Sequence, residues 1–421
     1  DRDRPTAWRY RDYVIDSFNR DTPYNVFIAE QLAGDELDWV NFHTRTATGF
    51  LRAGPRVDNR EKDNPQYRFE YLDDMIGTTS QAFLGLSVQC ARCHNHKFDP
   101  IPQKDYYRLQ AVFFPHVDIN HYLAPDAEAE TLRAREEEID ARIEPLRQQI
   151  AEIEAPYKEK VFIAEVLHRF PQDAQIAVKT PEAQRTPGQA LLANQLIRAV
   201  GVAAGSVEKA LSPADRTRRN TLLAEIQKLE KQRPKPPPSA AGVTDGDYRF
   251  APDSYGDEPA PGKGVQKEEG QGSYLHQGPG PYVPPPSYFL IRGEMESRGS
   301  RMEPGFITVI TEGAPPTAIP PVHGHTSGRR RALAEWIASP DNPLTSRVMV
   351  NRIWRHHFGR GIVATLNNFG KMGERPTHPE LLDWLATEFV ARGWSLKAMH
   401  RLIATSATYR QASHVRPDLA E

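Results

Sequence analysis

The chain contains only two cysteines, which are separated by two residues and followed directly by a histidine. They form the sequence Cys90-Ala91-Arg92-Cys93-His94, which has the pattern C-x-x-C-H of covalent haem attachment. Two thiols at this spacing can each form a thioether to one vinyl group of the same porphyrin, and the next imidazole can bind the iron. The motif therefore predicts haem c, with Cys90 and Cys93 as anchors and His94 as an axial iron ligand.

Two other chemistries are compatible with this cysteine pair. A redox-active dithiol of the thioredoxin type would require a βαβ context, whereas the residues before Cys90 have helical periodicity. A zinc site would require two further ligands, for which His94 and His96 are the only near candidates. Both chemistries remain alternatives to haem c.

The motif also predicts a compartment, because haem is joined to such cysteines outside the cytoplasm. We therefore expect a periplasmic or otherwise extracytoplasmic protein. The chain starts at Asp1 in polar sequence without a signal peptide, so we interpret it as N-terminally incomplete. It has no run of about 18 apolar residues, so no membrane span is expected. The net charge of −2 shows no basic excess, so no nucleic-acid partner is expected, and the run Arg329-Arg330-Arg331 is interpreted as a solvated helix start.

Hydrophobic periodicity predicts a mainly α-helical fold in four regions. Residues 1–122 are expected to form a cytochrome c-like haem-attachment domain, in which a helix from about Tyr67 delivers the cysteines and residues 35–65 form a loop. Residues 328–421 are expected to form a compact helical C-terminal domain that packs on the haem region.

Residues 123–233 are charged, and their apolar positions follow a coiled-coil seam. The seam comprises Leu132, Ile139, Ile143, Leu146, Ile150, Ile153 and Tyr157. Pro145 is expected to kink or restart the helix. Ser212, Pro213 and Asp215 have the pattern of a capped helix start and mark the return arm. The region therefore predicts a projecting antiparallel helical hairpin, which either docks a partner protein or packs only on itself.

Residues 234–327 are rich in proline and glycine and are expected to be a linker with little core. Two short apolar runs in it, at 288–293 and 306–310, are predicted to be strands that could pair.

Several strings in the sequence resemble a known family. Residues 8–14 and the segment 83–101, which includes the haem motif, resemble the planctomycete-type cytochrome c domain of unknown function. Residues 342–345, 350–359 and 378–385 are similar to the planctomycete-specific C-terminal domain that accompanies it. The resemblance implies haem binding and a role in extracytoplasmic electron transfer. One departure is Asn368, where the pattern leads us to expect aspartate.

The sixth iron ligand is left open by the motif. Met75 lies about 22 Å from Cys90 along a continuous helix, and His96 is too close to His94 to reach the opposite face, so a hydrogen-bonding role is expected for it. His116, His121, His356 and His357 could reach the iron through the fold. The pair His356-His357 is the preferred candidate, because a ligand from the C-terminal domain would explain why the two domains occur together.

Three functions are compatible with this composition of motifs. The preferred one is an electron carrier with two protein ligands that exchanges electrons with a redox partner protein. The alternatives are a haem-dependent oxidoreductase with an open iron position, for which no distinctive distal motif is present, and an interaction scaffold with structural haem. Whether the protein is an enzyme is left open.

Overall fold

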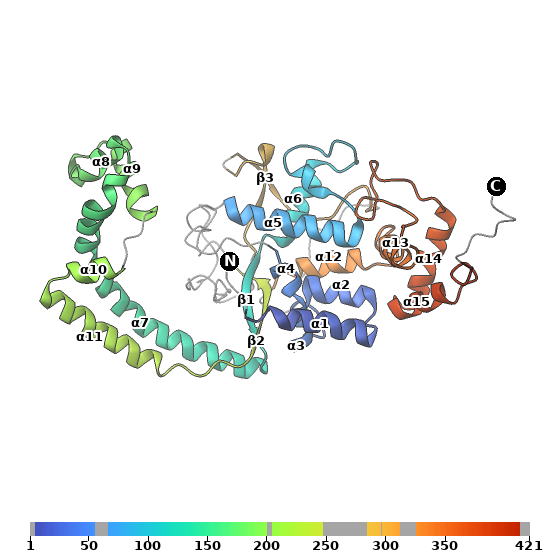
Figure 1. Cartoon of the computed structure of the whole chain (residues 1–421), viewed down its shortest axis with the longest axis horizontal. Coiled ribbons are helices and arrows are strands. Elements are labelled where there is room, and N and C mark those ends of the chain that lie inside the picture. Colours follow the sequence, from blue (N-terminus) through green and yellow to red (C-terminus); the bar gives the residue numbers. More distant parts are fainter. Residues whose placement is uncertain are drawn as a thin grey trace. The chain divides into compact units, whose positions relative to one another are not determined.

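The computed structural model describes residues 5–54, 66–199, 204–246, 284–295, 297–311 and 326–412. Helices dominate these ranges, together with two small antiparallel sheets, so the predicted mainly α-helical fold is confirmed (Figure 1). Two compact units are present. Residues 1–123 and 239–421 form the first, and residues 124–238 form the second. None of the described helices has the length and apolar character needed to span a membrane.

The first unit contains helices from both ends of the chain. Its helices are α1 (Ala7–Arg20), α2 (Tyr24–Ala33), α3 (Phe42–Ala47), α4 (Gly49–Arg52), α5 (Gln66–Thr79), α6 (Gln103–Phe113), α12 (Arg329–Ile337), α13 (Thr345–Phe358), α14 (Pro379–Ala391) and α15 (Leu396–Ala404). Its strands are β1 (His116–Tyr122), β2 (Ser239–Asp245), β3 (Ser287–Leu290) and β4 (Arg298–Met302). Because α3 and α4 lie within residues 35–65, the prediction of a loop there was wrong for these two helices.

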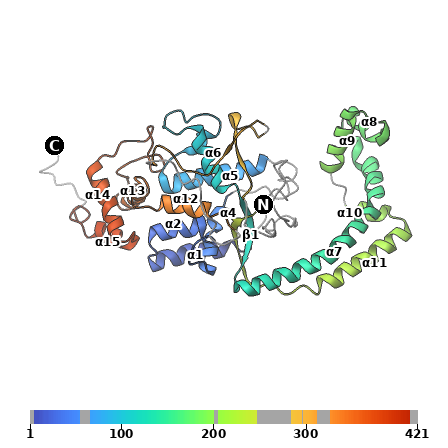
Figure 2. The same cartoon turned by 180° about the vertical axis from the view of Figure 1, so that it is seen from behind.

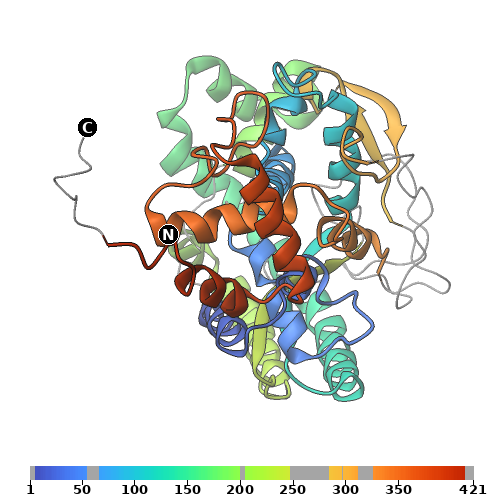
Figure 3. The same cartoon turned by 90° about the vertical axis from the view of Figure 1, so that its right-hand side faces the viewer.

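One hydrophobic core joins the N-terminal and C-terminal helices of this unit. Leu32 of α2, Leu72 of α5, Leu333 of α12 and Phe389 of α14 belong to the same buried cluster. Helix α12 lies beside α2 in both opposite views (Figure 2), and the C-terminal helices face the viewer in Figure 3. The expectation that the C-terminal domain packs on the haem region is therefore confirmed.

The second unit is inserted between two paired strands. Strand β1 pairs with β2 in antiparallel register, from His116 opposite Asp245 to Tyr122 opposite Ser239. The assignment of residues 239–245 to a linker was wrong, because these residues form a paired strand. Their small side chains allow close packing. A Cβ atom at Gly242 would overlap Thr48 Oγ1 and the ring of His121.

The second unit is mainly helical in its described part. Its elements are α7 (Asp126–Val161), a π-helical turn (Phe162–Val166), a 3₁₀ turn (Leu167–Arg169), α8 (Gln172–Lys179), a second 3₁₀ turn (Glu182–Gln184), α9 (Pro187–Ala199), α10 (Ala204–Ala210) and α11 (Pro213–Glu230). A small core beyond the hairpin, around Phe162, Leu167 and Val178, has no counterpart in the predictions from sequence.

Helices α7 and α11 form the predicted antiparallel pair. Ile139 and Ile143 of α7 pack against Leu229, while Tyr157 near the other end donates a hydrogen bond to Asp215. The predicted start of the return arm is confirmed, because Ser212 Oγ accepts a hydrogen bond of 3.1 Å from the backbone N–H of Asp215.

Pro145 and Pro156 do not end or restart α7, which runs continuously from Asp126 to Val161. A proline frees the carbonyl four residues before it. Here those residues, Ala141 and Glu152, are exposed, so water can bind the freed carbonyls and the prediction of a restart was wrong.

The two strands predicted in the 234–327 region are half correct. Residues 287–290 form β3, but its partner is β4 and not residues 306–310. Phe306 and Ile307 are instead buried in the core of the first unit, and the following Thr308 donates from its backbone N–H and its Oγ1 to Asp105 of α6 at 2.8 and 2.7 Å. These hydrogen bonds to α6 and the burial of the two apolar side chains explain why the run forms a turn and not a strand.

The interpretation of the arginine run as a solvated helix start was wrong for Arg330, which is buried. Its side chain is 0% exposed. The guanidinium makes two hydrogen bonds to Asp35, at 2.7 and 2.8 Å, and one to Asp245 at 3.2 Å. Burial opposes ionisation of Asp35, but the charge and hydrogen bonds of Arg330 outweigh it and lower the pKa of Asp35. The arginine thus joins α12 to the end of α2 and to β2.

Candidate haem site

The prediction that one helix from about Tyr67 delivers the cysteines was wrong, because the chain enters the cysteine motif through a sharp turn at Gly85. Helix α5 continues as a π-helical turn (Ser80–Leu84), and the motif begins in a 3₁₀ turn (Val88–Arg92). Gly85 lies between them with φ of +63°, a conformation that favours glycine. A Cβ atom there would lie 2.9 Å from the ring of Phe369 and 3.0 Å from Val348 Cγ2. The turn into the motif is therefore built against the C-terminal domain.

The inner side of the motif is fixed to α6. The backbone carbonyl of Arg92 accepts hydrogen bonds from Tyr107 Oη at 2.8 Å and from Gln103 Nε2 at 2.9 Å. Beneath it, Tyr106 Oη donates to Asp73 Oδ1 at 2.8 Å. Burial raises the pKa of Asp73, an effect that the Tyr106 hydrogen bond and the charge of Arg92 partly offset. These contacts hold the motif on a rigid polar base.

The outer side of the motif presents both thiols. Cys90 and Cys93 are exposed and free, whereas Ala91 between them is 0% exposed. The buried alanine fixes which side of the turn faces inward, so the two Sγ atoms remain accessible for thioether bonds. The structure brings together all three residues that the sequence predicted to hold the haem.

His94 is exposed, and one of its ring nitrogens is already engaged. Its Nδ1 lies 2.7 Å from the backbone carbonyl oxygen of Asn95. A carbonyl oxygen only accepts hydrogen bonds, so Nδ1 is the donor, and in the neutral imidazole Nε2 then presents a lone pair. This is the arrangement that orients metal-binding histidines, in which the second nitrogen donates to a carbonyl or a carboxylate. The donor set therefore fits a haem iron.

His96 has a different role in the loop after the motif. Its Nδ1 accepts hydrogen bonds from the backbone N–H groups of Phe98 and Asp99, at 3.3 and 2.8 Å. Because Nδ1 accepts, it is unprotonated, and the Asp99 carboxylate 3.6 Å away is not an ionic partner of this nitrogen. His96 folds the loop and leaves Asp99 free for other contacts.

Asp99 joins this loop to the C-terminal domain. Its Oδ1 accepts a hydrogen bond of 2.6 Å from the backbone N–H of Lys371, and Gly370 packs so closely on the carboxylate that a Cβ atom would overlap it. Nearby, the backbone N–H of Phe369 donates to Gly85 O at 2.8 Å. These contacts, which no local sequence signal indicates, hold the loop around residue 370 against both ends of the motif segment.

Arg352 of α13 adds a third link between the domains. Its guanidinium donates to the backbone carbonyls of Gln81, at 2.8 Å, and Ala82, and to Asn367 Oδ1 at 3.1 Å. Asn368, the departure from the expected aspartate, accepts a hydrogen bond from the backbone N–H of Gly370 at 3.0 Å through its amide oxygen. An aspartate would accept in the same way, so the substitution preserves this contact.

Of the preferred pair of sixth ligands, His357 has a partner within the C-terminal domain, and His356 is exposed. His357 Nε2 lies 2.9 Å from His400 Nδ1, and the ring of Tyr409 lies edge-on to His357 at 5.4 Å. In the described ranges, no hydrogen bond or ring contact joins His356 or His357 to the motif. His116 and His121 are buried in β1. Among the described residues, no contact thus links the preferred histidine pair to His94.

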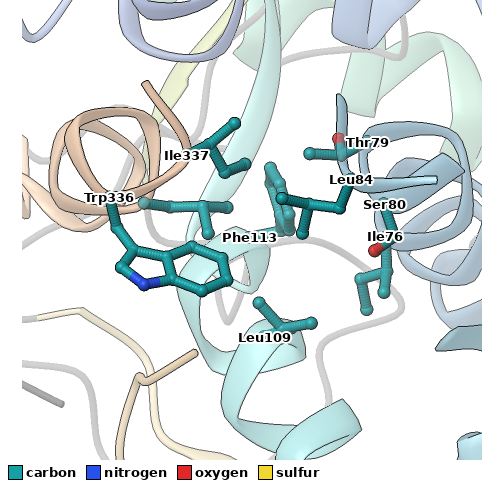
Figure 4. Close-up of a pocket in the computed structure, with 9 residues that line it drawn as sticks. Ile76, Thr79, Ser80, Leu84, Leu109, Phe113, Trp336 and Ile337 are labelled. Atoms are coloured by element: carbon teal, nitrogen blue, oxygen red, sulfur yellow. The ribbon is translucent and has the colours of Figure 1, made fainter. Parts of the chain in front are cut away.

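A cavity in the first unit lies between α5, α6 and α12 and is lined mainly by apolar side chains (Figure 4). The volume in which the centre of a water molecule fits is about 10 Å³. The cavity therefore has room for about one water molecule and far too little for a haem. The candidate site is instead the outer surface around the two thiols, where Phe98 and Ile291 are 44% and 51% exposed. Across the part of the chain that the structure describes, no group of three or more histidine, cysteine or acidic residues is placed to hold a metal ion.

The β3–β4 hairpin also reaches this surface. Its turn includes Gly293, with φ of +77°, and a Cβ atom there would lie 2.9 Å from Cys93 Sγ. This hairpin lies in the segment that the composition predicts to be a linker. The glycine that ends the apolar run 288–293 is a sequence signal for a turn, but nothing in the sequence indicates which surface that turn approaches.

Comparison with known families gives two matches, one at each end of the chain. Residues 1–117 match the family model PSCyt2, described as a protein of unknown function (DUF1549), and residues 329–421 match PSD1, described as a protein of unknown function (DUF1553). The order of the two matches is the order expected from the resemblance, which is thereby confirmed. No curated protein and no solved structure matches the chain.

Proposed function

The chain carries the two planctomycete cytochrome c-associated domains, PSCyt2 followed by PSD1, and we propose that it is an extracytoplasmic c-type haem protein that carries electrons. The observation that supports this most strongly is the state of His94. Its Nδ1–H is donated to the Asn95 carbonyl. In the neutral ring, the lone pair of Nε2 is then available to bind iron, in the same motif as two exposed thiols.

Each residue of the motif would have a distinct task. Cys90 and Cys93 would anchor the porphyrin through two thioethers, and His94 would bind the iron from one side. A bound haem supplies one-electron exchange between ferric and ferrous iron. The hydrogen bonds from Tyr107 and Gln103 to Arg92 O would keep the two anchors in place during that exchange, which favours fast transfer with little rearrangement.

The surface position of the motif favours a carrier over an enzyme. An oxidoreductase needs an acid or base aimed at an open iron position inside a pocket that excludes water. Here Cys90, Cys93 and His94 are all exposed, so a redox partner protein could approach the haem directly. Attachment through thioethers further implies a periplasmic or equivalent location.

The test is expression of the chain together with a haem c attachment system, followed by spectroscopy and acid-acetone extraction. We expect haem that resists extraction and a sharp α-band after reduction. The double variant Cys90→Ser/Cys93→Ser should lose the covalent haem, whereas His378→Ala, an exposed histidine elsewhere in the C-terminal domain, should keep it.

The outcomes separate the candidate functions. A high-spin spectrum that shifts with cyanide or peroxide would favour the oxidoreductase over the carrier. A folded chain without haem, in a host that matures a reference cytochrome c, would refute the proposal and leave Cys90 and Cys93 as a dithiol or metal pair.

A further inference from the structure

The loop that contacts the motif contains a tight turn from Gly370 to Gly373. The backbone N–H of Gly373 donates to Gly370 O at 2.9 Å, which closes a β-turn with Lys371 and Met372 at its centre. Glycine is required at both ends, because a Cβ atom would overlap Asp99 at position 370 and the Asn368 carbonyl at position 373. The turn is therefore a fixed platform for its two central side chains.

This platform is attached to the loop that follows the haem motif. Lys371 N–H binds Asp99 Oδ1 at 2.6 Å, and Asp99 lies only five residues after His94. From bond lengths alone, the Cα atom of Met372 lies within about 8 Å of the Asp99 carboxylate. The loop after the motif and the loop that carries Met372 lie side by side in Figures 1 and 3. The turn thus presents Met372 next to the segment that contains the first iron ligand.

Met372 is also the one methionine that the fold does not use for packing. The chain has six methionines, and all of them lie in described residues. Met75, Met302 and Met399 are buried, and Met295 and Met349 pack against the main core. Met372 is 59% exposed. Its thioether is therefore exposed on a tight turn, and that turn is hydrogen-bonded to the loop that follows the two thiols and His94.

We propose that Met372 Sδ is the sixth ligand of the haem iron, supplied by the C-terminal domain to a haem held by Cys90, Cys93 and His94. This inference rests on the proposed function. Methionine opposite histidine is a ligand pair of electron-transferring haem c and raises its potential. The proposal replaces His357, whose Nε2 is engaged by His400, and it explains through one residue why the C-terminal domain is built onto the motif.

The test compares ferric spectra of the haem-loaded protein and four variants. Sulfur ligation gives ferric haem a weak charge-transfer band in the far red. Met372→Leu, which keeps the size of the side chain and removes the sulfur, should lose the band and become high-spin. Met372→His should stay low-spin without the band and at a lower reduction potential. The matched control Met295→Leu and the variant His357→Ala should keep the wild-type spectrum.

Two results would overturn the assignment while leaving the haem protein intact. One is an unchanged band in Met372→Leu, or a band that disappears in Met295→Leu instead. The other is a wild-type spectrum without a sulfur band that becomes high-spin in His357→Ala, which would assign the histidine. Absence of covalent haem in the wild-type chain would refute the proposed function itself, and this inference with it.

Discussion

Replacing Arg330 by methionine is expected to destabilise the first unit by about 3–5 kcal/mol, the cost of removing one partner from a buried ion pair. The arginine side chain is 0% exposed. It makes hydrogen bonds of 2.7 and 2.8 Å to Asp35, and of 3.2 Å each to Asp245 and Glu36. Methionine fills much of the same volume but leaves three carboxyl groups buried without a cation.

The neighbouring arginine provides a matched control. Arg331 pairs with Asp38 and Glu335, whose side chains are 66% and 59% exposed. Exposed pairs of this kind contribute little, so Arg331→Met should cost less than about 1 kcal/mol. The comparison holds the substitution and the helix constant and changes only the burial of the guanidinium.

Urea unfolding followed by tryptophan fluorescence measures the difference. All six tryptophans lie outside residues 124–238, so the signal reports the first unit alone. With a slope near 3 kcal/mol per molar, the midpoint for Arg330→Met should fall by about 1–1.7 M. Equal midpoints for the two variants, at an unchanged slope, would refute the reasoning.

Three further outcomes follow from single features. Gly85→Ala forces a side chain into a left-handed conformation against Phe369 and should cost about 1–3 kcal/mol, measured by the same fluorescence titration and contradicted by an unchanged midpoint. Ser212→Ala removes the α11 cap and should lower the stability of the second unit by about 1 kcal/mol; thermal unfolding followed by far-ultraviolet circular dichroism would detect it, and an unshifted transition would argue against the cap. The pKa of Asp35 is lowered in the folded state. Its contribution to the free energy of unfolding is therefore fully present above the pKa of about 3.9 that it has in the unfolded state, and it is lost as the pH falls through the folded-state pKa. Stability should therefore drop below about pH 4 in the wild type and less steeply in Arg330→Met, and parallel pH profiles would contradict this.

Local patterns predicted the mainly helical fold and the helical hairpin. The cap at Ser212 and the antiparallel pairing of α7 with α11 depend on residues close in sequence or on a regular apolar spacing, so they could be predicted. The exposed thiols beside a histidine were likewise evident from the motif. These features are encoded within a few helical turns.

Several of the errors have a different cause, which is contact between residues far apart in the chain. Arg330 is buried because Asp35 and Asp245 meet it, and nothing within residues 329–331 indicates such partners. Residues 239–245 look like a linker until they pair with β1. The turn that carries Met372 can be linked to the motif only through the hydrogen bond between Lys371 and Asp99, which the sequence does not indicate. The sequence therefore reveals the cysteine motif but not the loop that contacts Gly85 before it and Asp99 after it.

The central claim is that haem is bound covalently at Cys90 and Cys93, and intact mass spectrometry of the denatured protein tests it most directly. After expression with a haem c attachment system, the account predicts a mass equal to the chain plus one haem, and the mass of the chain alone for Cys90→Ser/Cys93→Ser. The unmodified mass for the wild-type protein, in cells that load a reference cytochrome c, would contradict the account.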